Sequence, residues 1–263
     1  MKRIFLTGAS SGIGLAIAKA LVAKGHEVWG TARDEKKIPV VQGLHPIALE
    51  LRDRDSIAQS YARALQQAGS FDVLINNAGT GHFSPAESLS QKELTDYFQI
   101  LVFGQIELMQ LAMKSMREKG NGLIINVSSL ASRLPIPFMA AYNSAKAALA
   151  SFTMSMQLEL EGENIRVVDL QPADISTNFN AAVIKSDASD PRLAKAWQTV
   201  DQNMKAAPKP ELVASAVLKL IDQKNPPPRV TVGDTFQSLF APLIFRALPQ
   251  SVRLWGLKKY YGI

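Results

Sequence analysis

The chain has 263 residues, of which 47% are apolar, and its formal net charge is +6. This length and apolar content suit a large buried core, so we expect residues 1–263 to form one domain. The absence of cysteine excludes disulfides, thiolate metal sites and cysteine nucleophiles, and it suits a cytoplasmic location. No metal is expected, and without a basic stripe interleaved with aromatics nucleic acid is not an expected partner.

Short apolar runs alternate with helix-length segments along the chain. The N-terminal "MKRIFLTGAS" reads as a first strand rather than a secretory signal, and no run approaches the roughly 20 apolar residues that span a bilayer. Seven runs are predicted strands: Arg3–Leu6, Glu27–Thr31, Pro46–Leu51, Asp72–Asn76, Leu123–Val127, Ile165–Leu170 and Arg229–Gly233. Between them, Gly12–Lys24 and Ser56–Ala68 have apolar positions at helical spacing. The alternation predicts an α/β fold with a parallel sheet of about seven strands and helices on both faces.

A glycine-rich stretch, "TGASSGIG", follows the first predicted strand and opens the first predicted helix. Glycines here permit a tight turn and let the backbone approach a pyrophosphate, which free N–H groups at the helix start can bind. The alternative is an ordinary glycine-rich turn. The strand-loop-helix context favours a dinucleotide site contacted by Gly8, Ser11, Gly12, Ile13 and Gly14.

The second predicted strand ends near Ala32 and is followed by Arg33. An acidic residue near this point commonly holds the ribose hydroxyls of a dinucleotide, and Ala32 offers no such group. The Arg33 guanidinium can instead pair with a phosphate on the 2′-oxygen, and the Ser10 hydroxyl can reach the same phosphate. The pattern favours NADP(H) over NAD(H). The alternative is that Arg33 belongs to a solvated charged turn with Lys36 and Lys37, and the preceding glycine loop disfavours it.

Further along, "YNSAK" places Tyr142 and Lys146 four residues apart within a predicted helix, Ala140–Leu160, so that both lie on one face. A tyrosine hydroxyl is a poor acid–base catalyst at neutral pH unless a neighbouring cation stabilises the phenolate. Lys146 is in position to do this. Ser129, at the end of the strand in "LIINVSS", can donate a hydrogen bond to a substrate oxygen. Taken singly, a tyrosine and a lysine four residues apart are more often a surface pair, and a serine after a strand is more often a turn residue.

Together these stretches resemble the short-chain dehydrogenase/reductase family. The resemblance rests on "TGASSGIG", "NNAG" (76–79), "NVSS" (126–129), "YNSAK" and "LQPADISTNF" (170–179), in the order and spacing of that family. It covers residues 2–177 motif by motif, and beyond them only the layout is similar. It implies a Rossmann-type doubly wound fold in three α/β/α layers, a nicotinamide cofactor and a Ser-Tyr-Lys mechanism.

The resemblance also assigns roles to residues. It implies that Tyr142 is the general acid/base, that Lys146 lowers the pKa of Tyr142 and holds the nicotinamide ribose, and that Ser129 polarises the substrate oxygen. Further cofactor contacts that it implies are Glu50, Leu51, Asn77, Ala78, Gly79, Pro172, Ile175 and Thr177. Arg33 and Ser10 match its NADP-preferring members, and pairing through the helix of Tyr142 implies a homodimer or homotetramer.

Three positions depart from the family pattern. Leu101 replaces an asparagine whose backbone carbonyl helps to hold a water of the proton relay, and we expect this relay to survive through the leucine carbonyl. Glu50 replaces the usual adenine-contacting aspartate. Ala173 replaces the glycine that commonly follows the proline, which bears on the backbone shape beside the nicotinamide.

Two segments are expected on the substrate side: a lid at about 173–210 and an apolar flap at about 235–263. The flap combines aromatic and aliphatic residues with Arg246, Arg253, Lys258 and Lys259. Such a segment can lie in a membrane interface, which leaves peripheral membrane contact open. We favour packing over the cleft or against another subunit, because Pro242 and Pro249 interrupt any long amphipathic helix.

The predicted function is NADP(H)-dependent interconversion of a small-molecule carbonyl and an alcohol. The apolar flap favours a steroid, a retinoid or a long-chain carbonyl, and NADPH preference favours reduction. The alternative is a non-catalytic NADP(H)-binding redox sensor or regulatory module. An epimerase or dehydratase is disfavoured because nothing marks a nucleotide-sugar site.

Overall fold

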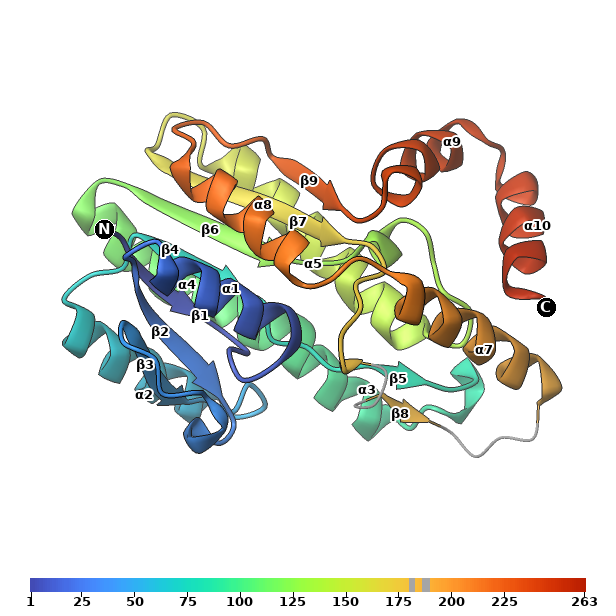
Figure 1. Ribbon diagram of the computed structural model, residues 1–263, viewed down its shortest axis with the longest axis horizontal. Helices are drawn as coiled ribbons and strands as arrows, with labels where there is room; N and C mark the ends of the chain where they lie inside the picture. Colours follow the sequence, from blue (N-terminus) through green and yellow to red (C-terminus); the bar gives the residue numbers. More distant parts are fainter. Residues whose placement is uncertain (180–182, 186–189) are drawn as a thin grey trace.

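The fold is built on a seven-stranded parallel sheet (Figure 1). The structure is a computed structural model that describes residues 1–179, 183–185 and 190–263. The sheet has the order β3-β2-β1-β4-β6-β7-β9, and each pair of neighbours is parallel. Its strands are β1 (Arg3–Leu6), β2 (Glu27–Ala32), β3 (Leu44–Ala48), β4 (Val73–Asn76), β6 (Gly122–Val127), β7 (Ile165–Pro172) and β9 (Arg229–Val232). The predicted doubly wound α/β fold is confirmed.

The strand positions agree with the apolar runs of the sequence, except at one edge. The sheet strand β3 begins at Leu44 and ends at Ala48, whereas the sequence predicted Pro46–Leu51. Its extent is set by its neighbour β2, since Ala48 pairs with Ala32, where β2 ends, and Leu49 N donates to Ala32 O at 2.8 Å. Glu50 and Leu51 therefore lie beyond the strand, in the connection to the next helix.

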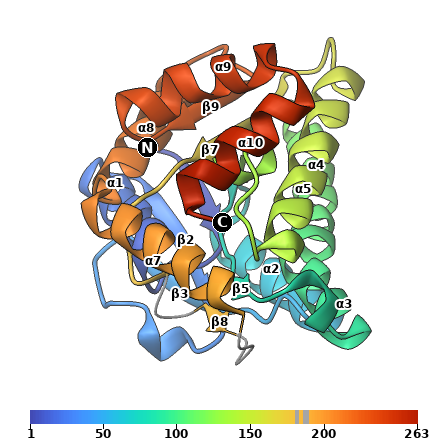
Figure 2. The ribbon, with the colours of Figure 1, turned by 90° about the vertical axis from the view of Figure 1, so that its right-hand side faces the viewer.

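Helices cover both faces of the sheet (Figures 1 and 2). One core cluster joins the sheet to α1 and α8, and a second joins it to α2, α4 and α5. The helices are α1 (Gly12–Ala23), α2 (Arg54–Ala68), α3 (Gln91–Phe98), α4 (Gly104–Lys119), α5 (Ala140–Glu159), α7 (Pro191–Ala206), α8 (Glu211–Asp222), α9 (Ala241–Ala247) and α10 (Gln250–Tyr261). The sequence is apolar on the inward faces of these helices, and burial of those faces holds the layers together.

The connections out of β1 and β4, which are neighbours in the centre of the sheet, run to opposite sides. The chain leaves β1 through α1 on one face, whereas β4 leads towards α4 on the other face. A crevice outside the carboxyl ends of the strands is expected at such a point, and it is where ligands bind to doubly wound sheets. The glycine-rich stretch lies there, directly after β1.

The C-terminal segment forms two short helices, as the two prolines indicate. Pro242 lies in the first turn of α9, and Pro249 immediately precedes α10. Pro249 is tolerated because its missing N–H would have no helical partner there, whereas Pro242 comes just after the π-helical turn Phe236–Phe240. A small two-stranded sheet, β5 (His82–Phe83) with β8 (Ile184–Lys185), lies on the same side of the molecule as α7. Within the described part of the chain, no helix has both the length and the apolar run that crossing a membrane requires.

Candidate active site

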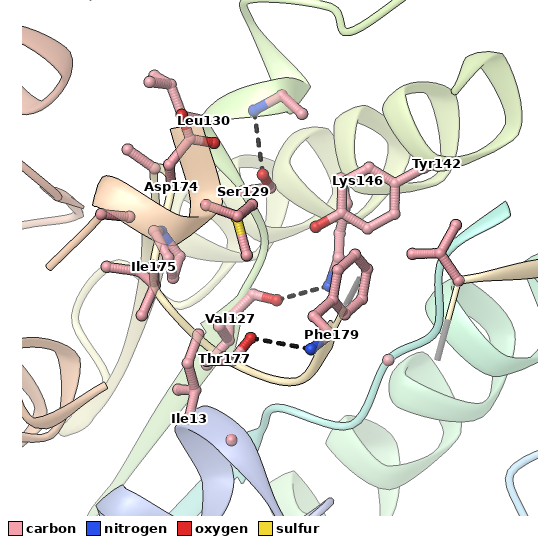
Figure 3. Close-up of a pocket in the computed structure, with 18 of the residues that line it drawn as sticks. Ile13, Val127, Ser129, Leu130, Tyr142, Lys146, Asp174, Ile175, Thr177 and Phe179 are labelled. Atoms are coloured by element: carbon pink, nitrogen blue, oxygen red, sulfur yellow. Dashed lines mark hydrogen bonds between the residues drawn. The ribbon is translucent and has the colours of Figure 1, made fainter. Parts of the chain in front are cut away.

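A cavity of about 800 Å³ opens at the carboxyl ends of the central strands (Figure 3). Its lining combines the glycine-rich loop, the ends of β2, β4, β6 and β7, the first turns of α5, and residues of α7 and α10. Of the residues predicted from the sequence to be catalytic or to contact the cofactor, all but Glu50 line this cavity. Residues from five separate motifs are thereby brought to one site.

The glycine-rich loop needs glycine for two different reasons. Gly8 and Gly12 have φ of 75° and 53°, a region that residues with a side chain rarely adopt. Gly14 is required by space, because a Cβ there would lie 2.0 Å from the carbonyl oxygen of Gly8. Ser11 precedes α1, and among the described side chains its hydroxyl caps no amide of that helix. The first amides of α1 are therefore available to an anion.

The loop is tied to β4 by Thr7, a buried residue that the sequence reasoning missed. Its Oγ1 accepts hydrogen bonds from the backbone N of Asn77 and of Ala78, both at 2.9 Å. The Asn77 amide in turn donates to the Thr7 carbonyl oxygen at 2.9 Å. This arrangement explains why an asparagine follows β4, and it places Ala78 and Gly79 beside the glycine loop. The threonine of "TGASSGIG" was the available signal.

Arg33 directly follows β2 and is exposed at the edge of the cavity. It forms no ion pair with any residue that the structure describes. Ser10 also lines the cavity. A guanidinium that has no protein partner and lies at this edge is available to an anionic ligand.

Glu50 is not in the cavity wall. Its carboxylate accepts a hydrogen bond from the backbone N of Arg52 at 2.9 Å, within the turn that follows β3. The buried residues Leu49 and Leu51 line the cavity instead. Apolar side chains therefore form this part of the wall.

Ser129, Tyr142 and Lys146 meet on one side of the cavity (Figure 3). Ser129 follows β6, and its Oγ accepts a hydrogen bond from the Ala131 amide at 3.1 Å. Tyr142 and Lys146 come from successive turns of α5, and the lysine Nζ lies 6.0 Å from the centre of the tyrosine ring. The Lys146 ammonium donates to the Val127 carbonyl oxygen at 2.8 Å.

The electrostatics of this trio differ from the sequence expectation. Burial lowers the pKa of Lys146 to about 8. Burial also raises the pKa of Tyr142 above its ordinary value, although the interaction with the Ser129 side chain opposes this. The expectation was that Lys146 depresses the pKa of Tyr142, but in this structure the ammonium is directed to a backbone carbonyl. Tyr142 is therefore protonated at neutral pH and can act as an acid.

The segment after β7 passes along the cavity wall. Ala173 donates its backbone N–H to the Val232 carbonyl oxygen at 2.7 Å, and among the described residues other than glycine only Phe138 has a positive φ. Alanine therefore replaces the family glycine at 173 without backbone strain. Pro172, Ile175 and Thr177 all face the cavity.

Leu101 is fully buried in a π-helical turn, Gln99–Phe103, that leads into α4. A Cβ added at Gly79 would contact Leu101 Cδ2 at 3.4 Å, so the leucine fills the space beneath the "NNAG" loop. The replacement of the family asparagine is therefore accommodated by packing. The participation of its carbonyl in a relay stays a hypothesis.

The far half of the cavity is enclosed by α7 and α10, which lie side by side in Figure 2. Asn203 of α7 donates a hydrogen bond to the Tyr260 hydroxyl of α10 at 2.8 Å. Leu257, Tyr260 and Tyr261 face the cavity. Of the predicted lid at about 173–210, residues 180–182 and 186–189 lie outside the described residues.

The fold and the cavity define a nucleotide-binding α/β protein with a polar trio beside its glycine loop. A family model described as short chain dehydrogenase matches residues 2–188. The chain belongs to this family, which confirms the resemblance read from its motifs.

Relatives that are similar over most of the chain support this family assignment. The chain is 29% identical to 3-ketodihydrosphingosine reductase of Bacteroides thetaiotaomicron, over 99% of this chain and 98% of that protein. It is 31% identical to carbonyl reductase (NADPH) 2 of Sus scrofa, over 84% of this chain and 89% of that one. The crystal structure of a short-chain dehydrogenase from Streptomyces avermitilis superposes with a TM-score of 0.83 at 29% identity, over 98% of this chain and 93% of that one.

Proposed function

We propose that the protein is an NADPH-dependent reductase that converts the carbonyl group of an apolar small molecule into an alcohol. The observation that carries the proposal is the convergence of Ser129, Tyr142 and Lys146 in a cavity that begins at the glycine loop. A non-catalytic nucleotide sensor would not need a buried, protonated phenol beside a serine hydroxyl. The reductases named above support the direction of the reaction.

The residues present fit a nicotinamide dinucleotide phosphate. The uncapped amides of α1 suit the pyrophosphate, and Arg33, with no ion-pair partner in the described structure, suits a 2′-phosphate. Asn77, Ala78 and Gly79 would line its adenosine side, and Pro172, Ile175 and Thr177 its nicotinamide side. When bound, this group supplies the hydride that reduces the carbonyl carbon.

The protein's own residues would handle the proton. The Ser129 hydroxyl donates a hydrogen bond to the substrate carbonyl oxygen and fixes its position. Tyr142, kept protonated by burial, transfers its hydroxyl proton to the same oxygen as negative charge develops there. The nearby Lys146 ammonium stabilises the phenolate that remains.

A panel of carbonyl compounds, from short and polar to long and apolar, tests the proposal. We expect wild-type protein to oxidise NADPH with the apolar members, followed by the loss of nicotinamide absorbance. Tight NADPH binding without turnover on any carbonyl or alcohol would instead support the sensor.

Arg33→Ala is expected to weaken NADPH binding by about 10- to 100-fold, the effect of losing one charge-assisted contact. NADH lacks the 2′-phosphate, so its affinity should stay nearly the same. Titration of wild type and variant with both nucleotides checks this. Equal weakening of both would refute the assignment of Arg33 to the phosphate.

The pH dependence of kcat/KM for carbonyl reduction should follow the loss of the positive charge of Lys146. With the pKa of Lys146 near 8, its positive charge is present below that pH and is lost above it. The value of kcat/KM for reduction should therefore be level at neutral pH and fall about tenfold per pH unit well above 8. A profile that is flat up to pH 10 would contradict a role for this charge.

The outer side of the flap supports peripheral contact with an anionic membrane. Residues 235–263 contain four lysines and arginines and no acidic residue, so they carry most of the net charge of +6. Leu243 and Trp255 are 60% and 64% exposed and do not line the cavity. Two copies of so basic a face would repel each other, which favours lipid over self-association there.

Leu243→Glu is expected to reduce binding to phosphatidylcholine vesicles that contain phosphatidylglycerol, measured by co-sedimentation. Val40→Glu is the matched control, because Val40 is a fully exposed apolar residue outside the flap. If the wild-type protein does not co-sediment with these vesicles, the membrane contact is refuted.

Assembly into a homodimer or homotetramer is proposed to use another surface. Met154 and Leu158, on the outer side of α5, supply exposed apolar area for it.

A further inference from the structure

The substrate half of the cavity has apolar walls and a negative end. Six large side chains of its lining are Leu134, Ile136, Met139, Phe179, Val183 and Trp197. Among the residues that the structure describes, the charged ones of the lining are Arg33, Lys146, Asp174 and Asp234. Arg33 lies at the proposed nucleotide end and Lys146 belongs to the trio, so the described charges left for the substrate are two carboxylates.

Asp174 is the more enclosed of the two carboxylates. Its Oδ2 accepts a hydrogen bond from Gln237 Nε2 at 2.6 Å, and its backbone N donates to Gln237 Oε1 at 3.3 Å. No described lysine, arginine or histidine forms an ion pair with it. It lines the same cavity as Tyr142, Tyr260 and Tyr261, and its charge contributes to the raised pKa values of their hydroxyls.

A carboxylate in this setting is costly unless a cation or several hydrogen bonds compensate it. Burial raises the pKa of Asp174, and the neighbouring charge of Asp234 raises it further. The protein supplies one amide, from Gln237, and no cation in the described structure. A positively charged group on a ligand would complete the site.

We propose that Asp174 binds an ammonium group of the substrate, so that the preferred substrates are apolar amino ketones. The inference rests on the proposed function and names its substrate class. Asp174 lines the same cavity as Ser129 and Tyr142, so one small molecule can present its ammonium to the carboxylate and its carbonyl group to the serine and the tyrosine. The apolar walls then receive the hydrocarbon remainder. Figure 3 shows Asp174 in the wall of the cavity that holds Ser129 and Tyr142.

A purely structural role for Asp174 is the competing explanation. Through Gln237 it joins the segment after β7 to the π-helical turn Phe236–Phe240. Asp174→Asn separates the two roles, because an asparagine amide oxygen can still accept from Gln237 while the charge is lost. A structural role predicts equal losses on all substrates.

The experiment compares two ketones of equal chain length, a long-chain 2-amino-3-ketone and the 3-ketone without the amino group, at pH 7 with NADPH. Wild type is expected to have a higher kcat/KM for the amino ketone by about 10- to 100-fold. Asp174→Asn should remove most of this preference through KM and leave the plain ketone nearly unchanged. Asp222→Asn is the control: it removes the same charge at an exposed position of α8 that does not line the cavity, so the preference should persist.

Each outcome is decisive. Wild type that reduces the plain ketone as well as the amino ketone overturns the inference and leaves the proposed function standing. A parallel loss on both ketones in Asp174→Asn also overturns it, in favour of the structural role. Wild type that reduces neither ketone, nor any of the carbonyl panel, refutes the proposed function and the inference with it.

Discussion

Tyr142→Phe is expected to lower kcat for carbonyl reduction by about 10²- to 10⁴-fold, the usual contribution of a positioned general acid. The substitution removes one hydroxyl and keeps the ring that packs against Phe179. NADPH affinity should change little, because the glycine loop and Arg33 are untouched. Single-turnover measurements with bound NADPH separate this chemical step from product release.

Tyr97→Phe is the matched control for that experiment. The Tyr97 hydroxyl is buried near the site and donates to the Thr80 carbonyl oxygen at 2.6 Å, but Tyr97 does not line the cavity. Its loss should cost about 1 kcal/mol of unfolding free energy and leave turnover largely intact. Equal turnover in Tyr142→Phe and in wild type would contradict the proposed role of the Tyr142 hydroxyl as the general acid.

Gly14→Ala is expected to abolish tight NADPH binding and to destabilise the fold. The added Cβ would meet the Gly8 carbonyl oxygen at 2.0 Å and Asn77 Nδ2 at 2.5 Å. The first contact is with backbone, so α1 must move away from the loop that it holds. Such overpacking typically costs about 1–3 kcal/mol or more, which urea unfolding measures directly.

Gly256→Ala shows whether this loss reflects the site or merely the glycine-to-alanine change. Gly256 lies within α10, and a Cβ there would meet no atom within 4 Å. Alanine is the better helix former by about 1 kcal/mol, so the control should be slightly stabilised and should bind NADPH normally. If Gly14→Ala binds NADPH as tightly as wild type, the close approach of loop and helix is not needed for the cofactor.

The sheet was largely predictable because each buried strand needs a run of apolar residues. Both faces of β4 and of β6 are covered, so nearly every residue is apolar and the run is visible in the sequence. The edge strand β3 was the exception. Its ends depend on pairing with β2, which leaves no mark in the sequence of β3 itself.

The site was predictable where a residue type serves a local need. Gly8 and Gly12 supply a backbone conformation, and Tyr142 and Lys146 share a face by helical spacing. Thr7 and Asp174 were missed although they stand inside the motifs that were read. Their importance arises from partners 70 and 63 positions away in the chain, Asn77 and Gln237.

The order of the motifs by itself determined the family and the parallel sheet, and it predicted the trio Ser129, Tyr142 and Lys146, since these follow from local pattern and spacing. The tertiary structure decided the charge state of that trio and the character of the substrate end of the cavity. Burial raises the pKa of Tyr142, and the fold brings the Val127 carbonyl oxygen to 2.8 Å from the Lys146 ammonium. Desolvation and long-range contacts are properties of the packed molecule, and no stretch of sequence records them.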